Sequence, residues 1–173
     1  MQNKRGIAQA FSTVPGGVTL RRATVFDVFS LSRVLIRSIT DLCAADHGND
    51  PRNLRLWTAN KDPETIRGWI VSGSVIWLAE AAGQVAAVGG IFETGKVSLL
   101  YVDPDHAGRG MGSKLLAKLE RELTALGCEE ARLDATRTAR DFYSKQGWVQ
   151  CGDPGSWNGI PQFPMRKSLH PVV

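Results

Sequence analysis

The stretch VSLLYVDPDHAGRGMGSKLLAKL, residues 97–119, joins three sequence patterns. It begins with an apolar run that predicts a strand, and Asp103-Pro104 ends this run. Glycines follow at alternate positions 108, 110 and 112, where a backbone without Cβ atoms can turn sharply. An amphipathic helix then begins and stops at Gly127. Its apolar stripe comprises Leu115, Leu116, Leu119, Leu123 and Leu126.

The glycine turn has the composition of a phosphate-binding loop. Its N–H groups lie at a predicted helix N-terminus, where unpaired donors and the positive end of the helix dipole favour an anion. Two common loops do not match: the third glycine of the dinucleotide fingerprint is missing, and Lys114 does not directly follow Gly112 as a P-loop requires. A turn that only allows the helix to pack on the strand is the alternative. The pattern alone names no ligand.

The rest of the chain alternates between predicted strands and helices. Strands are predicted over 18–24, as a three-strand meander within 74–102, and over 129–136, 148–153 and 162–169. Further helices are predicted within 25–45, 62–73 and 138–146, and a turn over 46–53. The order β-α-α-β-β-β-α-β-α-β-β predicts an α/β (α+β) fold with a mixed sheet and helices on both faces. We expect a flexible N-terminus, residues 1–16, and one domain, residues 17–170.

Composition narrows the class of protein. Apolar residues make up 43% and charged residues 22%, as in ordinary globular domains. We expect a cytoplasmic location without a membrane partner, because no apolar run is long enough to span a bilayer and no signal peptide is visible. The net charge is +4, and the basic residues form no run in the sequence, which argues against a nucleic-acid partner. Cys43, Cys128 and Cys151 form no Cys-x-x-Cys pair, so no metal site is indicated.

Two segments together resemble a known family. VDPDHAGRGMGSKLL (102–116) resembles the phosphate-binding motif Gln/Arg-x-x-Gly-x-Gly/Ala of the GCN5-related N-acetyltransferases, the GNAT family. ATRTARDFYSKQGW (135–148) resembles the family's later segment, in which an alanine, an aromatic-Tyr pair and a Gly-aromatic pair close the cofactor site. The predicted order of strands and helices from residue 18 to residue 169 also agrees with the order in that family. The chain thus resembles an uncharacterised bacterial-type GNAT protein.

The resemblance implies a sheet that splays open in its middle, with acetyl-CoA as cosubstrate in the gap and no metal. The backbone amides of the glycine turn hold the pyrophosphate in this reading, and the strand before it carries the pantetheine arm. The implied cofactor contacts are Val102, Ala107, Gly108, Arg109, Gly110, Met111, Gly112, Ser113, Thr136, Ala139 and Tyr143.

The resemblance also implies a chemistry, in which a primary amine attacks the thioester directly and forms a tetrahedral oxyanion. In this reading the backbone amides of Tyr101 and Val102 face the thioester carbonyl, where fixed N–H donors stabilise the negative charge that develops on the oxygen. Tyr143 stands where the family commonly has its general acid, and a phenol can protonate a leaving thiolate. The alternative is that Tyr143 only packs against the cofactor or hydrogen-bonds to it.

Three positions depart from the family pattern. Ala107 replaces the Gln or Arg that opens the motif, which removes one side-chain contact but leaves the backbone donors. Thr136 stands where many members have an asparagine that contacts the cofactor. Lys96 falls where histone-modifying members carry a glutamate base, and a charged lysine cannot act as that base. Acetylation of the histone type is therefore disfavoured.

No general base is assigned. The candidates are Glu80, Glu93, Asp46 and His47, and each is alternatively a solvated surface group. The segment 36–57 lies where the family builds its acceptor wall, with Cys43, His47 and Trp57 as candidate substrate residues or, alternatively, core residues.

The leading hypothesis is an acetyl-CoA-dependent N-acetyltransferase whose acceptor is a small-molecule amine rather than a protein. The alternative is a non-catalytic acyl-CoA sensor or interaction module with the same fold. An antiparallel edge near the C-terminus leaves a homodimer open as a family-level expectation.

Overall fold

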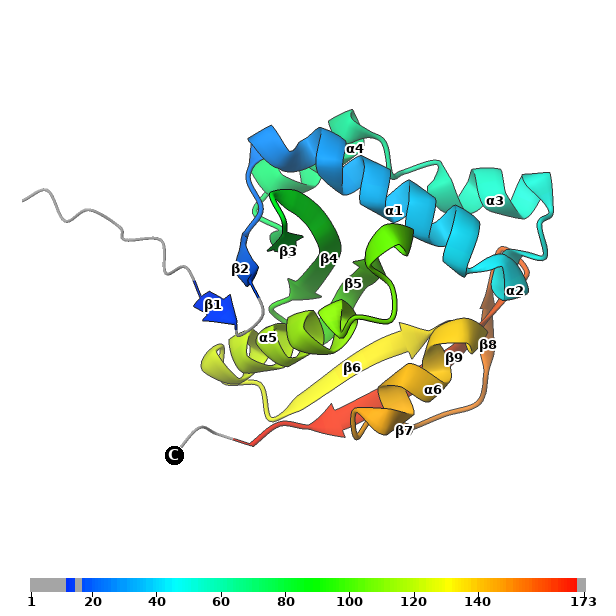
Figure 1. Ribbon diagram of the computed structural model, residues 1–173. Helices are drawn as coiled ribbons and strands as arrows, with labels where there is room; N and C mark the ends of the chain where they lie inside the picture. The colour runs from blue at the N-terminus through cyan, green and yellow to red at the C-terminus, as the bar shows by residue number, and fades with distance from the viewer. Residues whose placement is uncertain (1–11, 15–16, 171–173) are drawn as a thin grey trace, which may run out of the picture.

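The computed structural model describes residues 12–14 and 17–170 (Figure 1). The expected flexible segment 1–16 therefore lies mostly outside the described residues. One part of it differs from the expectation, because β1 (Ser12–Val14) pairs antiparallel with β2 (Val18–Arg22). The two strands form one edge of the sheet.

The sheet is mixed, as predicted. The antiparallel meander consists of β3 (Val75–Ala81), β4 (Gln84–Phe92) and β5 (Lys96–Val102), and β2 extends it on the side of β3. Beyond β5 lie β6 (Glu130–Ala135), β9 (Ile160–Ser168) and β7 (Val149–Gln150), while β8 (Gly155–Trp157) pairs with β9. The order across the sheet is β1-β2-β3-β4-β5-β6-β9-β7.

Strands β5 and β6 are parallel neighbours that separate almost at once. Within the described residues, Lys96 opposite Arg132 is their one paired position. By contrast, β6 continues alongside β9 over six paired positions, from Glu130 opposite Ser168 to Ala135 opposite Phe163. Figure 1 shows the gap between the green β5 and the yellow β6 widening away from that pair. The sheet is therefore splayed in its middle, as the family resemblance implies.

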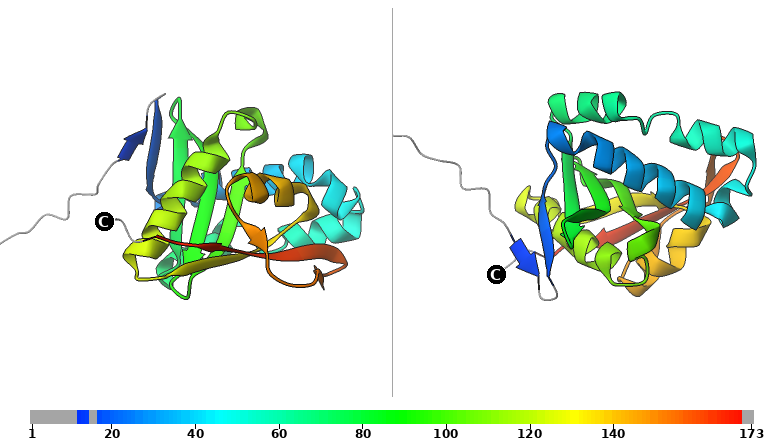
Figure 2. Two further views of the ribbon diagram at one scale, coloured as in Figure 1. Left: turned by 90° about the horizontal axis from the view of Figure 1, so that it is seen from below. Right: turned by 45° about the horizontal axis from the view of Figure 1, so that its top comes forward.

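Helices cover both faces of the sheet (Figure 2). One face carries α1 (Val28–Leu42) and α4 (Pro63–Val71), and the other carries α5 (Met111–Ala125). Helix α6 (Arg137–Lys145) joins the core on the α5 side through Tyr143. Five buried apolar residues of α1 and α4 pack on Ile76, Leu78, Val85 and Val88 of the sheet: Val28, Leu31, Val34, Leu35 and Ile66. In the described part of the chain, no helix combines the length and apolar character needed to cross a bilayer.

The leucine stripe of α5 is predicted correctly except at its end. Leu115, Leu116, Leu119 and Leu123 are buried between α5 and the sheet. Leu126 is 50% exposed although its N–H still donates to Glu122 O; it is the C-terminal cap, and the chain turns away at the next residue, Gly127, with φ +86°.

The predicted turn over 46–53 is wrong, since two short helices, α2 (Ala44–His47) and α3 (Pro51–Thr58), occupy most of it. The turn-forming residues act as helix caps instead. Gly48, with φ +64°, ends α2, and the Asp50 side chain accepts a hydrogen bond from the N–H of Arg52 with Pro51 at the first helical position. Caps and turns use the same residue types, so local composition did not separate them.

The C-terminal part also differs from the prediction. The strand predicted over 148–153 is limited to Val149–Gln150, and β8 was not predicted. Strand β8 joins β9 through Asn158 and Gly159, both with positive φ, in a two-residue hairpin between Trp157 and Ile160. Asn-Gly is the preferred sequence of such a turn, so the signal was present in the sequence.

Helix α5 approaches β4 closely at Gly89, where an added Cβ would lie 2.9 Å from Leu119 Cδ1 and 3.1 Å from Leu115 Cγ. We expect Gly89→Ala to lower the free energy of unfolding by about 1–3 kcal/mol, because the methyl group overpacks this contact. Gly68 in α4 is the control, since its added Cβ would meet nothing within 4 Å. Gly68→Ala is expected to raise the free energy of unfolding by up to about 1 kcal/mol, because alanine favours a helix interior. Urea denaturation measures both changes in the free energy of unfolding. If the two substitutions changed it in the same direction, the packing argument would be contradicted.

Candidate active site

The separation of β5 and β6 leaves a cleft of about 210 Å³. Its walls are these two strands, the C-terminal end of α1 and the first turns of α6. Among the predicted site residues, the cleft brings together Cys43, Tyr101, Val102, Thr136, Ala139 and Tyr143.

A second space lies beside the cleft, on the side of Trp57. This Trp57 pocket has a volume of about 170 Å³ and is also lined by Trp157 and Ile160 of the C-terminal hairpin. The residues that line both spaces are Val97, Ser98, Tyr101, Asp134 and Thr136. Two molecules held in the two spaces would therefore meet at the splayed strands.

The chain that leads from β5 to the glycine turn is fixed by Asp103, which is 1% exposed. The N–H of Asp103 donates to Ala86 O over 2.8 Å, and its carboxylate accepts a hydrogen bond from the N–H of Asp105. Arg37 of α1 reaches both carboxylates, over 3.0 Å to Asp103 and 3.1 Å to Asp105. These contacts hold the short 3₁₀ turn Pro104–His106 and give the glycine turn a fixed starting point.

Two of the three glycines in the turn have a backbone that requires glycine. Gly108 has φ +73° and Gly110 has φ +78°, and a Cβ added at either would meet nothing within 4 Å. Gly110 is the N-cap of α5 and supplies no side chain to its unpaired N–H groups. Open space thus adjoins the positive end of a 15-residue helix, which is the arrangement that favours an anion.

Gly112 does not share the turn conformation of the other two glycines, because it lies within α5 and has an ordinary helical backbone, while its contact with the cofactor through the backbone N–H stays a prediction. A Cβ at this position would lie 3.4 Å from both Phe142 Cζ and Val102 Cγ2. The glycine therefore allows α5 to pack closely against β5 and α6. Its neighbour Ser113 accepts a hydrogen bond from Gln146 Nε2 over 3.2 Å, which ties α5 to α6.

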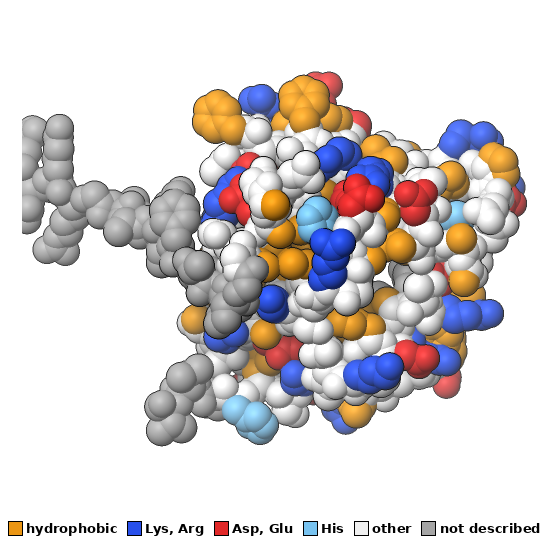
Figure 3. Space-filling view, in the orientation of Figure 1, with side chains coloured by type: hydrophobic (Ala, Val, Ile, Leu, Met, Phe, Trp, Pro, Cys, Tyr) orange, Lys and Arg blue, Asp and Glu red, His pale blue; other side chains and the backbone are white. Residues whose placement is uncertain are grey.

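The remaining predicted residues of the turn differ in accessibility. Ala107 and Arg109 are exposed, whereas the side chain of Met111 is 7% exposed and packs in the core. Met111 is the first residue of α5, so its backbone N–H has no partner within the helix and can face a ligand. Lys and Arg side chains also lie over α5 and α6 on the face that Figure 3 shows. Positive charge on these two helices attracts an anionic ligand.

Tyr143 reaches the cleft from α6. Its side chain is 7% exposed and makes edge contacts with the rings of Phe142 and Trp148, whose centroids lie 5.2 and 5.9 Å away. Its hydroxyl makes no hydrogen bond to another described residue. Burial raises the pKa of Tyr143 above its ordinary value, with the nearby Tyr101 as a smaller cause. Tyr143 therefore remains a protonated donor at neutral pH.

Tyr101 and Trp57 form a buried polar contact on the side of the Trp57 pocket. The indole Nε1 of Trp57 donates to the hydroxyl of Tyr101 over 3.2 Å, and burial raises the pKa of Tyr101 to about 12. Cys43 lies nearby and lines the cleft, and burial raises the pKa of its thiol to about 12. The thiol therefore remains protonated and is a poor nucleophile.

The structure does not bring His47 into either space. The ring is 1% exposed, its Nε2 lies 3.0 Å from Ile39 O and 3.3 Å from Thr40 O, and its Nδ1 accepts from the N–H of Asn49 over 3.0 Å. These contacts fix the Nε2–H tautomer and use both nitrogens. His47 thus ties α2 to the end of α1, and the prediction that it is a substrate or base residue is corrected to a structural role.

The carboxylate base candidates also lie elsewhere or are engaged. Glu80 binds Arg21 over 2.7 Å, and neither Glu80 nor Glu93 lines the cleft or the Trp57 pocket. Asp46 accepts hydrogen bonds from both the N–H and the hydroxyl of Thr138, which connects α2 to the first turn of α6.

Sequence reasoning missed two residues at the junction of the two spaces, Ser98 and Asp134. Strand β5 has a bulge at Ser98, since Leu99 pairs with Gly90 and Val97 with Ile91 and Ser98 has no partner between them. The Gly89-Gly90 pair in β4 was the available signal, because glycines inside a strand often mark a bulge. Asp134 is paired across the splayed strands with Lys96 over 2.8 Å.

Comparison with known proteins agrees with this geometry. A family model of the acetyltransferase (GNAT) domain matches residues 44–169. A GCN5-related N-acetyltransferase from Rhodopseudomonas palustris is 26% identical over 91% of this chain and 99% of its own, with a TM-score of 0.79.

Two further structures share the fold. PaiA N-acetyltransferase from Thermoplasma acidophilum, solved in complex with coenzyme A, is 21% identical over 87% of this chain and 98% of its own, with a TM-score of 0.75. The putative acetyltransferase YncA from Salmonella typhimurium, solved with acetyl-CoA, is 19% identical over 90% and 96%, with a TM-score of 0.63. With its splayed sheet, its glycine turn and the match over residues 44–169, the chain belongs to the GNAT family of acetyltransferases.

Proposed function

We propose that the protein binds acetyl-CoA in the cleft between β5 and β6 and transfers the acetyl group to a primary amine of a small molecule. The observation that carries the proposal is the presence of three features on neighbouring elements: the N-terminus of α5 without a side-chain cap, the cleft that ends at Val102, and Tyr143, which lines the cleft. PaiA and YncA, which share the fold, were solved with coenzyme A and acetyl-CoA respectively.

The residues present fit this cosubstrate. Gly108 and Gly110 leave open space beside the N–H groups of α5, where a pyrophosphate finds donors and no side chain in its way. Thr136 and Ala139 line the cleft at the start of α6, although the Thr136 hydroxyl already accepts from the N–H of Ala139 over 3.3 Å. The missing Gln or Arg at Ala107 leaves these donors intact.

The proposed reaction is acyl transfer, and acetyl-CoA supplies the activated acyl group as a thioester. The amine nitrogen attacks the carbonyl carbon with its lone pair, a C–N bond forms, and the C–S bond breaks with its electron pair going to sulfur. The backbone N–H of Val102 stabilises negative charge on the carbonyl oxygen. That of Tyr101 does not, because the antiparallel ladder in which Asp103 N–H donates to Ala86 O also directs the Tyr101 N–H towards Val88 of β4. Tyr143 donates its proton to the sulfur, and the proton that the nitrogen loses returns through solvent to the phenolate.

The size of the Trp57 pocket supports a small acceptor. Its volume of about 170 Å³ is bounded by Trp57, Trp157 and Ile160, which leaves space for a short side chain or a small amine. The cytoplasmic location, the absence of nucleic-acid and membrane partners, and a homodimer stay predictions.

One observation favours a second candidate, a non-catalytic acyl-CoA sensor. Asp134, the carboxylate that lines both spaces, is paired with Lys96, and Asp46 is bound to Thr138. A site whose carboxylates are all engaged has no evident base for an ammonium acceptor.

Two measurements separate these candidates. Calorimetric titration with coenzyme A tests binding, and thiol release from acetyl-CoA with a panel of amines tests transfer. Saturating coenzyme A at about 100 times its Kd is expected to stabilise the fold by about 2.7 kcal/mol, seen as a higher Tm. Binding with amine-dependent thiol release supports the enzyme, binding without release supports the sensor, and no binding contradicts both.

A further inference from the structure

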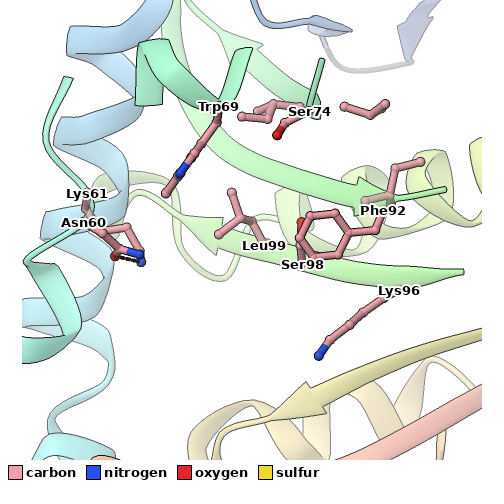
Figure 4. A pocket seen from close by; sticks show the side chains of 11 residues that line it. Asn60, Lys61, Trp69, Ser74, Phe92, Lys96, Ser98 and Leu99 are labelled. Carbon is pink, nitrogen blue, oxygen red and sulfur yellow. Dashed lines mark hydrogen bonds between the residues drawn. The ribbon is translucent and has the colours of Figure 1, made fainter. Parts of the chain in front are cut away.

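A third space lies along the sheet and adjoins both the Trp57 pocket and the cleft (Figure 4). This Lys61 pocket has a volume of about 370 Å³ and lies between α4, the turn before it, and the ends of β3, β4 and β5. It shares Lys96 and Ser98 with the Trp57 pocket, and Ser98 and Leu99 with the cleft. A molecule that places its amine at the splayed strands can therefore extend its other end into the Lys61 pocket.

Lys61 is a buried cation whose charge the protein does not balance. Its side chain lines the pocket and the residue is 7% exposed. Its Nζ donates to Asn60 Oδ1 over 2.6 Å and lies 5.8 Å from the centroid of the Trp69 ring, while no carboxylate among residues 17–170 is within ion-pair distance. The carboxylate next in sequence, Asp62, is used by the N–H and hydroxyl of Thr65.

A lysine in such surroundings is unusual, because burying an ammonium group without a counter-charge is costly. Burial lowers the pKa of Lys61, which is the expected response of a desolvated ammonium group. The other cation of the pocket, Lys96, already pairs with Asp134. The chain thus leaves one ammonium group facing the pocket with neutral partners only.

The other residues that line the Lys61 pocket are mostly apolar and indicate what the rest of the ligand is like. Trp69, Phe92 and Leu99 present apolar surface, and the labelled side chains of Figure 4 surround the space from α4, the turns on either side of α4, β4 and β5. These walls suit an apolar segment of a ligand, and Lys61 suits an anionic group at its end.

We propose that the Lys61 pocket binds an anionic group of the acceptor, so that the acceptor class is a primary amine that carries a carboxylate or phosphate on an apolar body. This inference rests on the proposed function, since it assigns the far end of that same acceptor. Lys61 supplies the counter-charge, and Trp69 and Phe92 contact the apolar body.

The test compares matched acceptors and matched lysines. The acceptors are 4-aminobutyrate, 6-aminohexanoate and phenylalanine, each against its neutral amide, with 3-aminopropyl phosphate as the phosphate arm. The variants are Lys61→Met, which keeps length and removes charge, and Lys118→Met as control. Lys118 also lies over a tryptophan, 4.2 Å from the Trp77 ring, but it pairs with Glu122 and does not line the pocket.

We expect the wild type to use at least one anionic amine with a kcat/KM about tenfold or more above that of its neutral counterpart. Lys61→Met is expected to lose this preference with unchanged affinity for coenzyme A, and Lys118→Met to keep it. Lys61→Met is also expected to raise the Tm, which verifies folding. Carboxylate or phosphate preference identifies the anion. If the wild type turns over neutral and anionic amines with equal kcat/KM, and Lys61→Met does the same, the inference is overturned and the proposed function stands.

A binding measurement separates failure of the inference from failure of the function. N-acetyl-6-aminohexanoate carries the anion but no reactive amine, and its calorimetric titration into the coenzyme A complex needs no turnover. If no amine releases thiol, the proposed transfer fails, and this titration decides the inference alone. Binding that Lys61→Met abolishes supports the anion site, and equal or absent binding in the two proteins overturns it.

Discussion

Replacing Tyr143 with phenylalanine is expected to lower kcat for thiol release by about 100-fold or more, which is the range of a lost general acid. The change removes the hydroxyl that lines the cleft and keeps the ring contacts with Phe142 and Trp148. Affinity for coenzyme A is therefore expected to stay within about twofold, since the glycine turn is untouched. Steady-state kinetics and calorimetric titration measure the two quantities.

Tyr101→Phe is the matched control, because Tyr101 is the other tyrosine of the chain and also has a raised pKa. Its hydroxyl accepts from Trp57 on the side of the Trp57 pocket, so its loss is expected to change the acceptor KM more than kcat. Equal losses of kcat in the two variants would contradict a specific acid role for Tyr143.

The pH profile gives a second check on Tyr143. A phenol acts as an acid only while protonated, and burial raises the pKa of Tyr143 above the ordinary value of about 10. The proton is thus retained through the range in which the acceptor amine loses its own. We expect kcat to rise between about pH 7 and pH 10 as amine deprotonates, with no fall assignable to Tyr143 in that range. A descending limb centred near pH 8 that disappears in Tyr143→Phe would contradict the assigned pKa direction.

Local patterns in the sequence predicted the parts of the fold that depend on local physics. Positive φ at Gly108 and Gly110, the stop at Asp103-Pro104 and the buried stripe of α5 all follow from residue type and spacing. The splay between β5 and β6 came only with the family resemblance, because it depends on which strands separate after one paired position.

Burial of polar residues was the part that the sequence did not reveal. His47 stands in a polar segment that resembles a surface loop, yet its ring is buried against the carbonyls at the end of α1. Lys61 stands between Asn60 and Asp62 in a polar stretch of the sequence, yet it is 7% exposed in the folded protein. Such residues acquire their surroundings from segments distant in sequence, so composition alone places them on the surface.

Replacing Gly110 with alanine is expected to weaken coenzyme A binding by about tenfold or more. The residue has φ +78° at the N-cap of α5, so a Cβ strains the backbone that aims the first N–H groups of the helix. The Cβ also enters space that is open in the protein and that the proposal assigns to phosphate oxygens. A tenfold change corresponds to about 1.4 kcal/mol of binding free energy.

Gly127 offers a control at the opposite end of the same helix. It has φ +86°, and an added Cβ there also meets nothing within 4 Å. Both alanine variants are therefore expected to lower the free energy of unfolding to a similar degree, by about 1 kcal/mol or slightly more, because each forces alanine into the left-handed region. Coenzyme A affinity is expected to fall only in Gly110→Ala, since the C-terminal end of a helix repels anions. Equal affinities for coenzyme A in the two variants would show that the phosphates bind away from this turn.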